Sequence, residues 1–178
     1  MNEPRPSRSA TSAQGDAATR DSADKPRRRK SPTPLVVATW AVRVCFAFVF
    51  VVNVQCALGF ALTPEAYLGA YELAGAPGRV AAQGIGVAFL MWNCTYPLVI
   101  WKPQRHTTLA GVVLAQQVVG LIGESAIRAT LPTGHDLLAS SIDLFIAFDA
   151  AGLLLMGVSL AVFLFTRNLC SKRREIDS

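Results

Sequence analysis

The sequence has 178 residues, of which 52% are hydrophobic and 16% are charged, and its formal net charge is +5. The charges lie outside long apolar runs, a pattern that is typical of membrane spans and excludes an ordinary water-soluble globular protein. Because the positive charges flank these runs, anionic lipid headgroups are a simpler partner than nucleic acid. Beyond residue 34 the chain is almost entirely apolar run or short connection, which leaves no room there for a separate soluble domain.

The first 34 residues differ in composition from the rest of the chain. They are rich in Ser, Pro, Ala, Arg and Asp and contain almost no large apolar side chain. Such a segment cannot bury a core, so we predict a disordered, basic cytoplasmic tail over residues 1–34. The apolar run that follows is longer than the roughly 7–15 apolar residues of a signal peptide. It also contains Arg43, so we interpret it as an uncleaved span.

Four apolar runs are each long enough to cross a bilayer as a helix, which takes about 20 residues. They cover approximately residues 35–62, 79–101, 107–130 and 137–165, and a basic cytoplasmic tail follows over residues 167–178. The predicted fold is therefore all-α, an integral membrane four-helix bundle formed by residues 35–166.

A short helix in the headgroup layer is predicted between the first and second spans. Thr63, Pro64 and Glu65 fit a helix start, with Thr as the cap and Pro at the first helical position. Tyr67 and Tyr71 fall on one face of this helix, where they would join the aromatic belt at the membrane surface.

Lys and Arg accumulate at one end of the spans, which predicts the topology. One side holds Arg27, Arg28, Arg29, Lys30, Lys102, Arg105, Arg167, Lys172, Arg173 and Arg174, and the other holds Arg79 and, near its surface, Arg128. Since such residues mark the cytoplasmic side, both termini are expected there, in a multi-pass protein of a cell membrane such as a bacterial inner membrane. The basic tails are expected to contact anionic headgroups.

The third span carries a polar stripe. Gln117, Gly120, Glu124 and Arg128 follow at steps of three, four and four, which places them on one helical face. Lipid tolerates such a stripe poorly, so it should face protein or a water-filled cavity. An ion pair between Glu124 and Arg128 within the helix is the simpler explanation of these two residues.

Polar residues of the four spans fall into two layers when depth is estimated from the helical rise. The inner layer lies about 12–15 Å from the cytoplasmic ends and contains Arg43, Asn93 and Gln116 or Gln117. We expect Arg43 to hydrogen-bond Asn93 or Gln117, with snorkelling toward the cytoplasm as the alternative.

The outer layer is the predicted ligand site. Glu124 and Asp149 lie about 25–27 Å deep and should face each other, with Arg128 nearby. Two acids in such a site should not both ionise readily, so the pair could bind a cation, exchange a proton or grip a polar headgroup. The candidate ligand-binding residues are Glu124, Asp149, Arg128, Gln117, Gln83, Asn53 and Asp143. For the amides, hydrogen bonds that only hold spans together are the alternative.

Small residues four positions apart could bring helices into close contact. The pairs are Ala82 with Gly86, Gly111 with Ala115, and Ala147 with Ala151. Asp143 shares the face of Ala147, so we expect it to point into a tight helix contact.

Several chemistries lack their motifs. The cysteines, Cys45, Cys56, Cys94 and Cys170, form no Cys-x-x-Cys pair, and neither a phosphate loop nor a hydrolase motif is present. His106 and His135 fall on opposite sides in the predicted topology, which argues against a bis-His haem, and His135 is expected in a solvated turn. These observations do not favour an enzyme or a metal site, and they specify no cofactor.

The second span opens with Gly78-Arg79 and continues with Gly84-Ile85-Gly86. Together with four short spans and cytoplasmic ends, this pattern resembles the DoxX-like group of small bacterial membrane proteins over roughly residues 35–166. Some members of that group are associated with quinone-linked oxidation of sulfur compounds. The cysteines here form no pair that would support redox chemistry, so the resemblance implies the architecture and no catalytic residue.

Three functions fit these patterns. The first is an outward-facing polar site that binds a small ligand, a proton or cation, or a lipid. The second is a DoxX-like subunit that handles a quinone, and the third is an assembly protein that binds a membrane partner or a second copy of itself. An open cavity lined by Glu124 and Asp149 would favour the first, a lateral slot the second, and a filled interior the third.

Overall fold

The computed structural model describes residues 33–176, except for the side chain of Arg174, and every regular element in this range is a helix. The predicted disordered tail lies, apart from its last two residues, outside the described residues. The elements are α1 (Thr33–Leu62), α2 (Glu65–Leu68), α3 (Gly75–Asn93), α4 (Tyr96–Trp101), α5 (Thr107–Thr130) and α6 (Asp136–Ile176).

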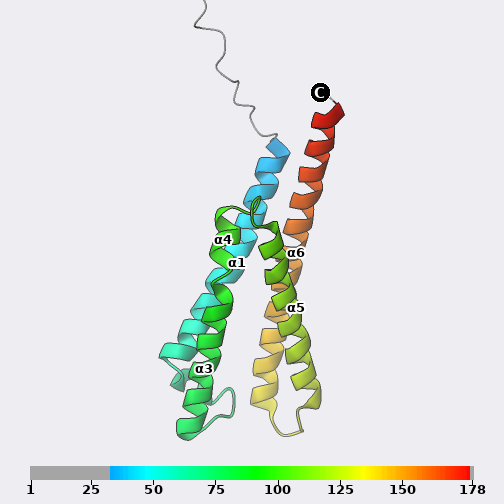
Figure 1. Ribbon diagram of the computed structural model, residues 1–178. Helices are drawn as coiled ribbons and strands as arrows, with labels where there is room; N and C mark the ends of the chain where they lie inside the picture. The colour runs from blue at the N-terminus through cyan, green and yellow to red at the C-terminus, as the bar shows by residue number, and fades with distance from the viewer. Residues whose placement is uncertain (1–32, 177–178) are drawn as a thin grey trace, which may run out of the picture. The chain divides into compact units, whose positions relative to one another are not determined.

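Four segments are long and apolar enough to cross a membrane, as the sequence predicted. They are Thr33–Leu62, Gly75–Trp101, Thr107–Thr130 and Asp136–Arg173. α1 packs against both α3 and α6, and α6 packs against α5 (Figure 1). The α4 segment contacts α1 and α5, whereas α3 and α5 are not closely packed against each other.

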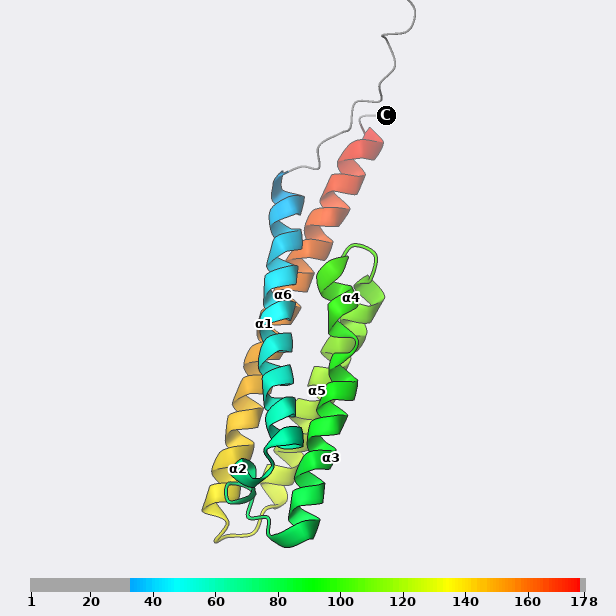
Figure 2. The ribbon, with the colours of Figure 1, turned by 90° about the vertical axis from the view of Figure 1, so that its left-hand side faces the viewer.

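The two ends of these helices differ. We call the end with residue 33, the 102–106 connection and residues 166–176 the tail end. The opposite end, with the 63–74 and 131–135 connections, is the loop end (Figure 2).

The predicted second span is interrupted near its tail end. α3 stops at Asn93 and α4 starts at Tyr96, because Pro97 has no N–H to bond the Asn93 carbonyl and its ring crowds that group. Side chains bond to backbone carbonyls of the last turn of α3 at this break. The Asn93 amide donates to the Phe89 carbonyl at 2.7 Å, and the Thr95 hydroxyl donates to the Trp92 carbonyl at 3.1 Å.

The last helix runs beyond its predicted end at residue 165. α6 continues to Ile176, so the described part of the basic tail is helical. After Gly157 the segment contains neither glycine nor proline, and lysine and arginine are good helix formers.

The connection between α1 and α3 contains the expected short helix, but its start differs from the prediction. The Thr63 hydroxyl donates to the Gly59 carbonyl of α1 at 3.0 Å and does not cap α2. The nearby tyrosines turn toward the helices, since Tyr67 stacks on Phe60 at 4.3 Å between ring centroids and Tyr71 meets Phe60 edge-on at 5.4 Å.

Of the three small-residue pairs, one forms a close helix contact within this chain. Ala82 and Gly86 are buried on α3, and a Cβ atom at Gly86 would lie 2.6 Å from both the Ala57 carbonyl oxygen and the Ala61 nitrogen. The other two pairs, Gly111 with Ala115 and Ala147 with Ala151, are exposed on α5 and α6.

The expected burial of Asp143 is wrong. Its side chain is 55% exposed and forms an ion pair with Arg128 across the α5–α6 contact. It therefore does not point into a tight helix contact.

Candidate functional site

A buried polar cluster lies midway along the helices, formed by Asn53, Tyr96, Gln117 and Asp149. The Gln117 amide donates to Asp149 Oδ1 at 2.7 Å, and the Tyr96 hydroxyl donates to Gln117 Oε1 at 3.5 Å. The Asn53 side chain lies beside the Tyr96 hydroxyl. Three of the four long helices and α4 therefore contribute one side chain each.

Gly120 allows the Asp149 carboxylate to approach α5. A Cβ atom at Gly120 would lie 2.8 Å from Asp149 Oδ2 and 3.1 Å from the Trp92 ring. The glycine in the polar stripe thus creates the space that the carboxylate occupies.

A small pocket of about 20 Å³ adjoins the polar cluster, with room for about one water molecule. Glu124 and Asp149 both line it, together with Asn53, Phe89, Trp92, Asn93, Gln117 and Phe145. The predicted convergence of Glu124 and Asp149 is present in this geometry. Glu124 Oε2 is buried and has no hydrogen-bond partner among the described residues.

A larger cavity of about 290 Å³ lies between the small pocket and the loop end. We call it the loop-end cavity; it is lined by Phe60, Tyr71, Ile85, Phe89, Glu124, Ile127, Leu138, Ile142 and Phe145. Phe89, Glu124 and Phe145 line both spaces, so the apolar cavity adjoins the polar pocket at Glu124.

Four aromatic rings form a connected wall of the loop-end cavity. Phe60, Phe89 and Phe145 lie 6.2–6.4 Å apart between ring centroids, and Tyr71 lies 6.3 Å from Phe145. The sequence gives no sign that Phe60, Phe89 and Phe145 form a site, because aromatic residues within spans are ordinary packing residues when viewed one at a time. Tyr96 was missed for the same reason. Tyr71 was expected at the membrane surface and lines the cavity.

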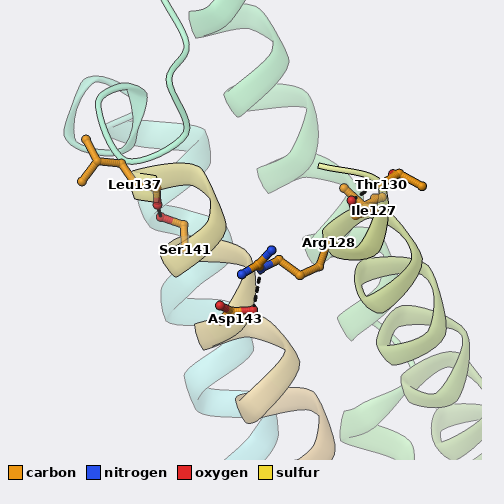
Figure 3. Close-up of polar contacts among 6 residues, drawn as sticks. All are labelled: Ile127, Arg128, Thr130, Leu137, Ser141 and Asp143. Carbon is orange, nitrogen blue, oxygen red and sulfur yellow. Dashed lines mark hydrogen bonds and ion pairs between the residues drawn. The ribbon is translucent and has the colours of Figure 1, made fainter. Parts of the chain in front are cut away.

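Arg128 and Asp143, two of the predicted ligand residues, lie outside the cavity. Arg128 reaches across from α5 to Asp143 on α6, with 2.9 Å between Arg128 Nε and Asp143 Oδ1 (Figure 3). The alternative of an ion pair between Arg128 and Glu124 within α5 is therefore wrong. Neither of the two lines the loop-end cavity or the small pocket.

The predicted inner layer does not form a hydrogen-bonded unit. An Arg43 guanidinium nitrogen donates to the Trp101 carbonyl at 2.9 Å, and the guanidinium lies 5.1 Å from the centroid of the Trp40 ring. Asn93 bonds within its own helix, so the expected contact of Arg43 with Asn93 or Gln117 is wrong. The last carbonyls of α4 have no partner within their helix, and one of them, at Trp101, accepts the hydrogen bond from Arg43.

The remaining glutamines occupy separate positions. Gln83 donates to the Ala61 carbonyl at 3.4 Å across the α1–α3 contact, which fits the helix-holding alternative. Gln116 lies in an open groove beside Trp92, and its Oε1 atom is buried without a hydrogen-bond partner among residues 33–176.

No protein-family model, curated protein or solved structure matches the chain. The site is therefore interpreted from its geometry.

The loop-end cavity is bounded by a segment that is tied to the start of α6. Glu72, next to the cavity residue Tyr71, is hydrogen-bonded to His135, and the Ser141 hydroxyl donates to the Ala70 carbonyl at 2.9 Å. His135 therefore has a specific partner, although its side chain is 44% exposed, as expected for a solvated turn. Glu72 has φ of +53°, an uncommon backbone conformation for a non-glycine residue.

The tie between Glu72 and His135 predicts a dependence of stability on pH. The hydrogen bond from His135 lowers the pKa of Glu72 from its ordinary value of 4.5. A lowered pKa stabilises the fold at pH values above 4.5, and this contribution is lost as the pH falls through the lowered pKa. The melting temperature of Glu72→Gln should therefore lie below that of the wild type at pH 6 and approach it as the pH falls below 4.5. A difference that stays constant down to pH 3 would contradict this assignment.

Proposed function

We propose that this chain is an integral membrane protein that binds a small ligand in the loop-end cavity. The ligand's polar group lies against Glu124 and Asp149, and its apolar body lies among the aromatic rings. Ligand sites are typically concave and mostly apolar, with a few polar groups that fix orientation. The loop-end cavity has this composition, with Glu124 as its acidic residue.

The observation that carries this proposal is that Glu124 lines both the apolar cavity and the polar pocket. The apolar cavity of about 290 Å³ is near the lower limit for small-molecule sites, about 300 Å³. An unpartnered carboxylate oxygen in its wall would be costly unless a ligand, water or a proton satisfies it. A polar or charged ligand group provides that partner.

A buried core lies between the polar cluster and the tail end, which supports binding from one side over conduction across the membrane. This core consists of Ala38, Val42, Phe46, Val49, Tyr96, Val99, Ala110, Val113, Met156, Leu160 and Phe163. Apart from Tyr96, which belongs to the polar cluster itself, these side chains lie between that cluster and the tail end. The site is thus a cavity that approaches the loop end, and the geometry does not resemble a pore.

The proposed topology places the loop end outside the cell. Lys102, Arg105, Arg167 and Lys172 lie at the tail end, and basic residues mark the cytoplasmic side. Both termini are then cytoplasmic, and the helices form a four-helix bundle in the cell membrane.

A quinone is the second candidate ligand, in line with the resemblance to DoxX-like proteins. The loop-end cavity has walls from α3 and α5, which do not pack closely together, and such a seam gives a hydrophobic ring a lateral route from lipid. The aromatic wall would stack on a quinone ring. This alternative shares the site and differs in the ligand's charge.

Cysteine labelling tests the proposed access and topology together. In a cysteine-free variant, a cysteine in place of Glu124 should react with a membrane-impermeant thiol reagent added to intact cells, as the proposed access from the loop end requires. A cysteine in place of Gln104, in the tail-end connection, should react only after permeabilisation. Reaction of position 104 in intact cells would contradict the topology, and an unreactive position 124 would contradict access from outside.

A further inference from the structure

The acids of the site have no basic partner within the described part of the chain. Arg128 pairs with Asp143 at 2.9 Å, and Arg79 pairs with Glu65 at 3.2 Å. No Lys, Arg or His among residues 33–176 lines either the loop-end cavity or the small pocket. A cationic partner for the Glu124 carboxylate in this cavity must therefore come from outside these residues.

The two acids have different partners. Asp149 is 9% exposed and accepts a hydrogen bond from Gln117 at 2.7 Å, so a protein donor already satisfies it in part. Glu124 Oε2 is buried and unpartnered, and Glu124 also lines the larger cavity. Glu124 is thus the acid available for a direct contact with a ligand.

The aromatic rings of the cavity supply the second feature that a cation recognises. The rings of Phe60, Phe89, Phe145 and Tyr71 surround the apolar part of the cavity. The face of an aromatic ring attracts a cation, and aromatic cages bind quaternary ammonium groups in this way. An anion would be repelled by the carboxylates.

We propose that the ligand is a small lipophilic organic cation, with an ammonium group beside Glu124 and an apolar body against the aromatic wall. This inference rests on the proposed function and names the ligand class of the same site. An ion contact in a poorly hydrated cavity is stronger than the same contact in water, because the local dielectric constant is lower. The positive charge of the ligand also gives Glu124 Oε2 a partner, which none of the described residues provides.

The test compares a cation with its neutral isostere. Benzyltrimethylammonium and neopentylbenzene have the same shape and differ by one positive charge. Binding to the full chain in nanodiscs would be measured by the fluorescence of Trp92, which lines the small pocket, in a Trp40→Phe/Trp101→Phe background. Each probe is compared between variants, so its partitioning into lipid cancels.

Glu124→Gln keeps the shape of the side chain and removes its charge. This substitution should weaken binding of the cation at least about tenfold, a loss of about 1.4 kcal/mol in binding free energy. It should change the affinity for the neutral isostere by less than about twofold. Glu124→Asp should retain most of the cation's affinity. The matched control, Asp143→Asn, removes a carboxylate outside the cavity and should alter neither probe.

The outcomes separate the ligand class from the site. Equal effects of Glu124→Gln on both probes, or no binding of the cation to the wild type, would overturn the cationic class. Ile85→Trp fills the cavity and should prevent binding of both probes. If either probe still binds to this variant with wild-type affinity, the proposed site itself is wrong.

Discussion

Replacing Gly86 with alanine should destabilise the protein more than any other single added methyl group on α3. The new Cβ atom would lie 2.6 Å from the Ala57 carbonyl oxygen and the Ala61 nitrogen. Both are backbone atoms of a helix, so no side-chain rotation relieves the clash and α1 and α3 must separate. Overpacking of this kind costs about 1–3 kcal/mol, only partly offset by the better helix propensity of alanine.

Gly84→Ala is the matched control for this prediction. Gly84 lies two residues away on the same helix, and nothing lies within 4 Å of its added Cβ atom. It should leave stability unchanged or raise it by up to about 1 kcal/mol. Unfolding by dodecyl sulfate in mixed micelles would compare the two variants. Equal stability of Gly86→Ala and Gly84→Ala would show that the α1–α3 contact is not as close as described.

Replacing Gln117 with leucine should be the second strongly destabilising change. The substitution removes the donor to Asp149 Oδ1 and the acceptor of the Tyr96 hydroxyl. A buried group that loses its partner costs about 1–3 kcal/mol, and more when it is charged. For ligand retention, in contrast, the sequence predicts a smaller effect of Gln117→Leu than of Asp149→Asn, and that expectation stays a prediction. For stability, Asp149→Asn should cost less than Gln117→Leu, because asparagine can still accept the hydrogen bond from Gln117.

The neighbouring residue provides the control for Gln117. Gln116 faces an open groove and its Oε1 atom has no hydrogen-bond partner among the described residues, so Gln116→Leu should cost little. The double variant Gln117→Leu/Asp149→Leu should recover much of the loss, since it replaces both polar groups. If Gln117→Leu is as stable as Gln116→Leu, Gln117 does not hold the Asp149 carboxylate.

The span-length helices could be predicted because long apolar runs with flanking charges leave few alternatives to a helix. Their ends were less predictable. The break at Pro97 depends on local backbone geometry, and α6 extends through residues 166–176 because nothing in that sequence stops a helix. The break at Pro97 and the end of α6 each depend on residues within one or two helical turns. These residues leave the average hydropathy of the span almost unchanged.

Helical periodicity placed Gln117, Gly120 and Glu124 on one face, and the structure brings this face to Asp149. The estimated depth of a side chain in the membrane could not by itself predict its hydrogen-bond or ion-pair partner. Arg128 lies at nearly the same height as Glu124 and as Asp143, and it pairs with Asp143, whereas Arg43 pairs with the end of α4. Long, flexible side chains choose among several acceptors within reach, so their partners depend on the rotation of each helix as well as on height.

The most direct test of the central claim is whether the loop-end cavity holds a ligand. Native mass spectrometry of the protein extracted from its own membranes should detect a bound small molecule on the wild type. Ile85→Trp, which fills the cavity wall, should abolish this adduct. Val87→Trp adds the same ring on α3 at a residue that is 52% exposed and lines neither the loop-end cavity nor the small pocket, and it should retain the adduct. No adduct on the wild type, or an adduct that persists in Ile85→Trp, would contradict the proposal that this cavity is the ligand site.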